Sequence, residues 1–132
     1  MLKKTITYHD FDGNKRTEDF YFNLTQAEIV KMDLAADGGS MEKMLNKIIR
    51  TEDIKKIADI VDDFIRKSYG EKSDDGKRFI KSPELSEAFA QTEAYSQLFI
   101  ELLSEEGANL AKFVNGIIPQ DVAAEVAKLN KQ

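Results

Sequence analysis

The sequence contains no cysteine and only one histidine among its 132 residues. The absence of cysteine excludes disulfide bonds, thiol catalysis and metal sites built from thiolates. A single histidine excludes histidine clusters around a metal ion and most catalytic triads. His9 alternates with Tyr8 in a predicted strand, so we expect the histidine to face solvent.

The chain also lacks a long apolar run and an excess of positive charge. No run approaches the roughly 20 residues that a membrane-spanning helix needs, and the opening MLKKTITYHDF has no apolar segment typical of a signal peptide. The 24 acidic residues outnumber the 19 basic ones, giving a net charge of −5, which argues against binding to a nucleic-acid backbone. We therefore expect no membrane and no nucleic-acid partner, and a location in the cytoplasm.

The remaining composition is that of a globular protein, and the length suits one domain spanning residues 1–132. Residues 2–24 predict a β-hairpin, because apolar and polar residues alternate on both sides of a turn at Asp10–Asn14. Asp12-Gly13 supplies the positive φ that a tight hairpin needs. The return strand is expected at Lys15–Phe22, with Phe20, Phe22 and Leu24 on its apolar side.

Residues 25–118 predict a helical core. Thr25 and Glu28 have the spacing of a capping box at the start of the first helix, which is expected to end at Asp37-Gly38-Gly39. A second helix is expected at about residues 40–50, and a third runs from the cap at Thr51 to Tyr69-Gly70. Ser82 and Pro83 then open one long helix that reaches Leu103.

The last part of the chain predicts a helix over about residues 108–115, ended by Gly116, and a C-terminal helix or tail over residues 119–132. The fold class is therefore α+β and dominated by helices, with the N-terminal β-hairpin packed against five or six α-helices.

Six apolar residues are candidates for contact with a partner protein. Phe79 and Ile80 lie in a polar loop predicted at Glu71–Ser82, where they either cover the core of their own domain or face a partner. Tyr95 and Leu98 broaden the apolar stripe of the long helix. Ile117 and Ile118 precede Pro119 in what we expect to be an exposed connector.

Carboxylates are the only groups that would support an enzyme. Asp59, Asp62 and Asp63, or Asp74 and Asp75, would have to form a metal site, but no histidine and no defined ligand spacing accompanies them. We expect the first three to lie on a solvated helix face. The sequence thus predicts no catalytic residue, no metal, no cofactor and no enzymatic activity.

Three segments resemble the tail assembly chaperones of long-tailed phages and prophages of Gram-positive hosts. They are TITYHDFDGNKRTEDFYFNLTQAEI near the start, DGKRFIKSPELSEAFAQTEAYSQLFIELL ending at Leu103, and AKFVNGIIP at Ala111 to Pro119. The resemblance covers nearly the whole chain and has no catalytic content.

This resemblance implies a protein that acts in the host cytoplasm during phage morphogenesis and is absent from the mature virion. Such chaperones bind and solubilise the tape measure protein, help to recruit tail tube subunits, and are often also made in a longer, frameshifted form. Self-association is a further expectation, because the hairpin has exposed edges. The alternative is a structural tail protein retained in the virion, whose hairpin adds to a tube sheet.

Overall fold

A computed structural model describes residues 1–35, 54–105 and 108–118 of the chain. The predicted helix at residues 40–50, its neighbouring signals at Asp37-Gly38-Gly39 and Thr51, and the predicted C-terminal helix or tail lie outside the described residues. Within the described residues, nine elements follow one another in the order β1 (Leu2–His9), β2 (Lys15–Phe22), α1 (Gln26–Ala35), α3 (Ile54–Ser68), β3 (Tyr69–Lys72), β4 (Phe79–Ile80), α4 (Pro83–Ala90), α5 (Glu93–Leu103) and α6 (Ala108–Ile117).

The N-terminal hairpin is confirmed with the predicted strands and turn. β1 pairs with β2 from Leu2↔Phe22 to His9↔Lys15 without interruption. Gly13 has a φ of 85°, and its N–H donates to the carbonyl of Asp10 over 3.0 Å. His9 is exposed, as expected. The α+β class follows from this hairpin together with the five described helices.

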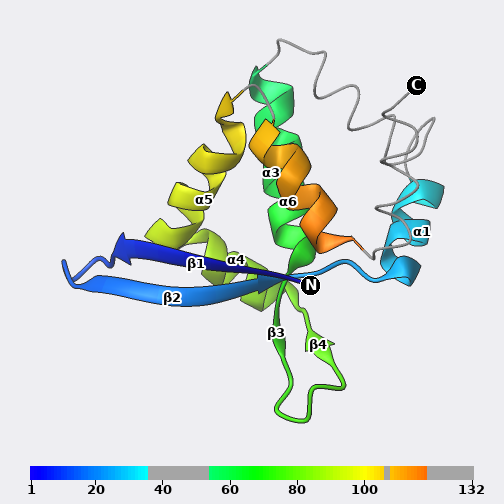
Figure 1. The fold of residues 1–132 in the computed structure, drawn as a ribbon, viewed down its shortest axis with the longest axis horizontal. Coiled ribbons are helices and arrows are strands. Elements are labelled where there is room, and N and C mark those ends of the chain that lie inside the picture. Colours follow the sequence, from blue (N-terminus) through cyan, green and yellow to red (C-terminus); the bar gives the residue numbers. More distant parts are fainter. Residues whose placement is uncertain (36–53, 106–107, 119–132) are drawn as a thin grey trace.

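The expectation of a polar loop at residues 71–82 is wrong, because the chain there forms a second hairpin. Tyr69 and Gly70 do not close α3 but pair with Phe22 and Tyr21 of β2, and β3 in turn pairs with β4. The predicted Ser73–Gly76 turn forms the hairpin loop, in which the Ser73 N–H donates to the carbonyl of Arg78. The result is a four-stranded antiparallel sheet in the order β1-β2-β3-β4, with the β3–β4 hairpin extending away from the helices (Figure 1).

The single long helix predicted from Pro83 to Leu103 is two helices. Its start is confirmed, since the Leu85 N–H donates to the Ser82 side chain over 3.1 Å. The chain then leaves the helix at Gln91, and Thr92 caps a new one by accepting the Tyr95 N–H over 3.2 Å. Because Thr92 takes an extended conformation, α4 and α5 run in different directions (Figure 1).

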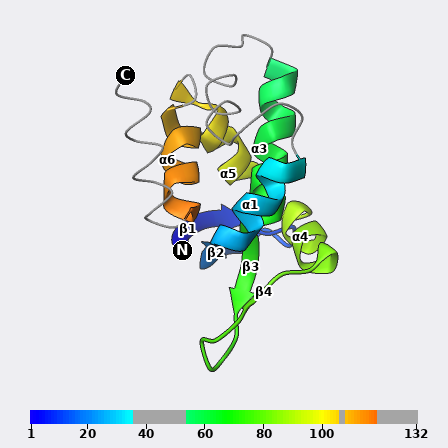
Figure 2. The ribbon, with the colours of Figure 1, turned by 90° about the vertical axis from the view of Figure 1, so that its right-hand side faces the viewer.

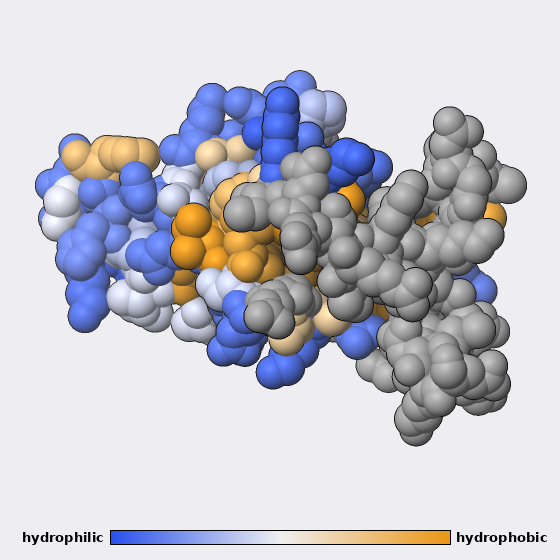
Figure 3. All heavy atoms as spheres, turned by 90° about the horizontal axis from the view of Figure 1, so that it is seen from above, coloured by the Kyte–Doolittle hydropathy of each residue, from blue (hydrophilic) through white to orange (hydrophobic). Residues whose placement is uncertain are grey.

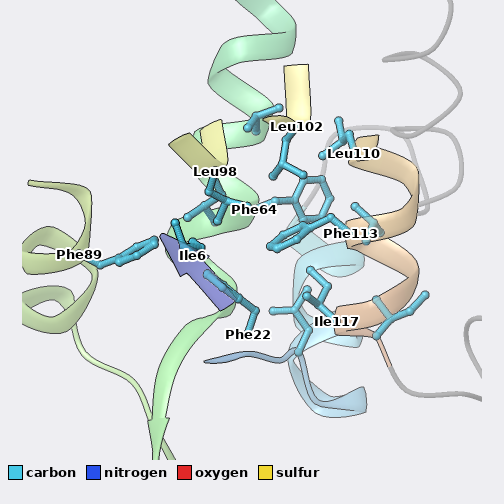
Figure 4. Packing of buried hydrophobic residues seen from close by; sticks show 14 of the residues in the cluster. Ile6, Phe22, Phe64, Phe89, Leu98, Leu102, Leu110, Phe113 and Ile117 are labelled. Atoms are coloured by element: carbon cyan, nitrogen blue, oxygen red, sulfur yellow. The ribbon is translucent and has the colours of Figure 1, made fainter. Parts of the chain in front are cut away.

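The hydrophobic core lies between one face of the sheet and α3, α5 and α6, which rise from that face (Figures 1 and 2). Phe22 is fully buried at its centre and meets Phe113 edge-on, with 5.3 Å between the ring centroids. In Figure 4, side chains from β1, α5 and α6 converge around it. The buried apolar residues are Ile6, Tyr8, Phe22, Leu24, Ile29, Val61, Phe64, Ile65, Phe89, Ala94, Leu98, Leu102, Leu110, Phe113, Val114, Ile117 and Ile118.

One carboxylate ties α1 to the second hairpin. The predicted capping box is confirmed, because Glu28 Oε1 accepts the Thr25 N–H (2.9 Å) and Thr25 Oγ1 accepts the Glu28 N–H (3.2 Å). The other oxygen of Glu28 pairs with Lys81 Nζ at 2.7 Å. Burial alone would raise the pKa of Glu28, but the hydrogen bonds from Lys81 and Thr25 outweigh it, so the pKa lies below its usual value of 4.5.

This lowered pKa makes the attachment of α1 sensitive to acid. A carboxylate whose pKa is lower in the folded state stabilises the fold above its unfolded pKa, and that contribution is lost as the pH falls through the folded pKa. We expect the urea midpoint of the wild type to fall more than that of Glu28→Gln between about pH 7 and about pH 3. Asp74→Asn, in the β3–β4 loop, is the control and should keep the wild-type profile. If the urea midpoints of wild type and Glu28→Gln fall equally as the pH is lowered, ionised Glu28 does not stabilise the attachment of α1.

Candidate functional site

Three of the six predicted partner-binding residues are buried. Leu98 is 1% exposed, Ile117 is 0% and Ile118 is 3%. The expectation of an exposed connector at Ile117-Ile118 is wrong, since α6 continues through Gly116 and the carbonyl of Ile117 accepts the Leu24 N–H over 2.7 Å. These three side chains belong to the hydrophobic core, and their predicted role in partner binding stays untested.

Phe79 and Ile80 are half-buried in β4, where they pack on their own hairpin. A Cβ at Gly70 would lie 2.7 Å from both a ring carbon of Phe79 and the carbonyl oxygen of Ile80. Gly70 therefore allows the two strands of the hairpin to approach each other closely. Lys81 Nζ lies 5.7 Å from the centre of the Phe79 ring. These contacts favour the interpretation in which the pair covers its own domain.

Tyr95 belongs to an apolar surface on α5, which we call the α5 stripe and define as Tyr95, Phe99, Ile100 and Leu103. Tyr95, Phe99 and Leu103 are spaced four residues apart, so they follow one side of the helix, and all three are partly buried against the core. The rings of Tyr95 and Phe99 stack with 5.8 Å between centroids. Ile100 is 60% exposed at the outer border of the stripe.

Hydrophilic residues lie along the border of this surface. Seen from above, an apolar area lies in the region of α5, with hydrophilic side chains next to it (Figure 3). An exposed apolar area with a polar border is typical of a surface that binds another protein. The stripe is therefore the candidate functional site.

A polar cluster of Asp62, Arg66, Glu87 and Tyr95 holds one end of the stripe in place. Arg66 Nε donates to both carboxylate oxygens of Asp62 at 2.9 and 3.1 Å, and its Nη1 donates to Glu87 Oε2 at 2.7 Å. The Tyr95 hydroxyl donates to Asp62, and burial together with this contact raises the pKa of Tyr95. The cluster links α3, α4 and α5, so the first ring of the stripe has a fixed position.

The carboxylates considered for a metal site mostly have other partners. Asp62 belongs to the Arg66 cluster, Asp63 pairs with Lys67 at 2.8 Å, and Asp75 accepts the Ser73 hydroxyl at 2.6 Å. Within residues 1–35, 54–105 and 108–118, no group of three His, Cys, Asp or Glu side chains is placed to hold a metal ion. In the same part of the chain, no helix is long and apolar enough to cross a membrane.

Of the four stripe residues, the sequence singled out Tyr95 and did not single out Phe99, Ile100 or Leu103. The signal that finds them is the capping residue Thr92, because a helix restarting there buries Ala94, Leu98 and Leu102. The neighbouring line of Tyr95, Phe99 and Leu103 is then displaced toward the surface.

Comparison with known proteins gives one assignment. Neither a search of curated proteins nor a search of solved structures found a match. A protein-family model described as "Phage tail assembly chaperone" matches residues 1–132, which is the whole chain. On this match, the chain belongs to the phage tail assembly chaperone family.

Proposed function

We propose that the chain binds the tape measure protein of its phage, keeps it soluble, and helps to recruit tail tube subunits. The observation that carries the proposal is the family match over the entire chain. The role is one of binding without catalysis. The site of action is the host cytoplasm, and the chain is absent from the mature virion. Proteomics of purified virions would test this absence.

The α5 stripe supplies a surface suited to such a client. An amphipathic client helix would lay its apolar side along Phe99, Ile100 and Leu103, as helices do when they bind in apolar grooves. Three of the four stripe residues already share their apolar area with the core, so the area left for a client is modest. A client that must later be released to tube subunits requires a contact of limited affinity, and affinity depends on the quality of a few contacts more than on area.

Two further properties belong to the proposal. The chain is also made in a longer, frameshifted form, and it self-associates or associates with that form. Mass spectrometry of infected cells would detect peptides of the longer form, and native mass spectrometry would detect the assemblies. Absence of the longer form would remove that part of the proposal alone.

Co-expression with the tape measure protein tests the central claim. We expect most of the tape measure protein to move from the pellet to the soluble fraction when this chain is present, because its apolar helical surface is then covered. The measurement is the amount of tape measure protein in each fraction after lysis and centrifugation.

A general folding aid, co-expressed at the same level, is the control and should leave the client in the pellet. Equal insolubility of the client with and without this chain would refute the proposed binding. Recovery of this chain in tube-like copy number from purified virions would instead support a structural tail protein.

A further inference from the structure

The sheet has one long edge and one short edge. β1 is the outermost strand at one side and contains eight residues. β4, at the opposite side, contains two. Proteins shorten, bend or interrupt exposed edge strands to prevent pairing with other chains. Only the β4 edge is shortened here. β1 instead carries the charged side chains Lys3 and Lys4, which hinder pairing with another lysine-bearing edge.

The hydrogen bonds of the first turn show which β1 residues direct their backbone groups away from β2. The Asp10 N–H donates to the carbonyl of Asn14 at 2.9 Å, so this opposed pair is a hydrogen-bonded one. In an antiparallel ladder such pairs alternate with pairs that make no bonds to each other. The register of β1 and β2 therefore leaves the N–H and C=O groups of Lys3, Thr5, Thr7 and His9 pointing to the free edge.

No other part of the described chain occupies that edge. Among residues 1–35, 54–105 and 108–118, the backbone of Leu2–His9 makes hydrogen bonds with β2 alone. The strand contains no proline and its register has no bulge. α3, α5 and α6 stand above the sheet rather than beside β1 (Figure 2). The edge thus has the geometry that accepts an added strand.

The charge along the edge indicates which strand would fit. Lys4 points toward the helices and pairs with Glu101 at 2.9 Å, whereas Lys3 is exposed on the outer face. Thr5 and Thr7 occupy the same face and bond across the ladder to Asp19 and Thr17. An incoming strand would therefore meet two hydroxyl-bearing positions and Lys3, which has no ion-pair partner among residues 1–35, 54–105 and 108–118.

A second copy of this chain would supply no carboxylate for Lys3. Antiparallel pairing of two β1 strands about Ile6 sets Lys3 opposite His9, and pairing about Thr5 sets Lys3 opposite Thr7. Opposite charges across a ladder stabilise it, and an unmatched charge does not. The edge is better matched to another protein than to itself.

We propose that the β1 edge binds an extended segment of a partner protein, which adds a fifth strand and places a carboxylate beside Lys3. This interaction goes beyond the proposed function and uses a different surface from the α5 stripe. Its test does not depend on the tape measure protein, so either proposal can fail alone.

The test uses amide hydrogen exchange of the full chain, followed by NMR, with the capped peptide Glu-Val-Thr-Val-Thr-Val-Glu as the probe. We expect exchange at Lys3, Thr5 and Thr7 to slow about tenfold when about nine-tenths of the protein is bound, because only the free fraction exchanges. The peptide in which both Glu residues are replaced by Lys should protect these amides less.

Two variants at one position separate backbone pairing from side-chain contact. Thr7→Pro removes an outward N–H without breaking a bond to β2, whereas Thr7→Val keeps that N–H and loses only the hydroxyl. Protection of Lys3 and Thr5 should persist in Thr7→Val and disappear in Thr7→Pro. Lys3→Glu, which leaves the backbone unchanged, should reverse the preference between the two peptides.

Three results would overturn the proposal. The first is unchanged exchange at Lys3, Thr5 and Thr7 with the Glu peptide, and the second is equal protection in Thr7→Pro and Thr7→Val. The third is protection that rises with protein concentration when no peptide is present, which would assign the edge to a second copy of the chain.

Discussion

The variant Ile100→Asp is expected to leave the tape measure protein largely in the insoluble fraction during co-expression. Ile100 is the most exposed residue of the α5 stripe, at 60%. Burial of such a side chain against a client contributes about 1.5–3 kcal/mol, and a carboxylate in the same place opposes burial. Affinity should therefore fall at least about tenfold. Two quantities are measured: the soluble fraction of the client during co-expression and the melting temperature of the purified variant.

Val30→Asp is the matched control for this variant. Val30 is an apolar residue exposed to 52% on α1, outside the stripe. Both substitutions change a surface position, so each should alter the free energy of unfolding by no more than about 1 kcal/mol. Val30→Asp should still keep the client soluble. If both variants lose the client equally, or if Ile100→Asp keeps it, the stripe is not the client surface.

Phe89→Ala is expected to destabilise the fold strongly. Phe89 is 3% exposed, and its ring stacks on Tyr69 with 4.4 Å between centroids and 9° between planes. It also meets the rings of Phe20, Phe22 and Tyr95. Removal of a buried phenylalanine costs about 3–5 kcal/mol, which is a large part of a typical stability of about 5–15 kcal/mol. The shift in urea midpoint between wild type and variant measures this loss of stability.

Phe11→Ala is the control for the loss of an aromatic ring. Phe11 is 77% exposed in the β1–β2 turn, so its truncation should change the free energy of unfolding by less than about 0.5 kcal/mol. A similar loss of unfolding free energy in both variants would contradict the expected contribution of the buried Phe89 ring to stability. Phe89→Ala should also release Tyr95, the first residue of the stripe, from its edge-on contact.

The parts of the fold that the sequence predicts correctly depend on neighbouring residues. The Asp12-Gly13 turn, the Thr25–Glu28 capping box and the Ser82 cap each require only a few consecutive positions. Each is present with its expected hydrogen bonds or backbone geometry. Local signals of this kind do not depend on where the rest of the chain packs.

The second hairpin escaped prediction because its strands are too short to show alternation. β4 has two residues and β3 has only four, so at most one of them reaches the lower end of the range of about four to eight residues over which a strand pattern is recognisable. What makes them strands is pairing with Tyr21 and Phe22, which lie about fifty positions earlier. The predicted Ser73–Gly76 turn was the available signal, since a turn between two apolar positions also suits a hairpin.

One of the four residues of the candidate site was among those that the sequence singled out. Tyr95 lies in this site, whereas Leu98, a candidate for partner contact, is buried. The helix that restarts at the Thr92 cap turns Leu98 toward the core together with Ala94 and Leu102. The burial of Ile117 could have been predicted, since Leu110, Phe113, Val114 and Ile117 keep helical spacing across Gly116. Apolar residues that keep helical spacing predict that a helix continues, and here this signal outweighs a glycine near the helix end.

The contacts at the end of β2 have a consequence for synthesis of the protein on the ribosome. Asn23 and Leu24 donate their backbone N–H groups to Ser68 and Ile117, respectively, and Phe22 packs against Phe113. The first hairpin is therefore synthesised long before the residues that cover it. Its apolar face remains uncovered until α6 has been synthesised. The fold closes only when nearly all of the described chain has been translated, so a nascent chain stalled before residue 113 would expose Phe22.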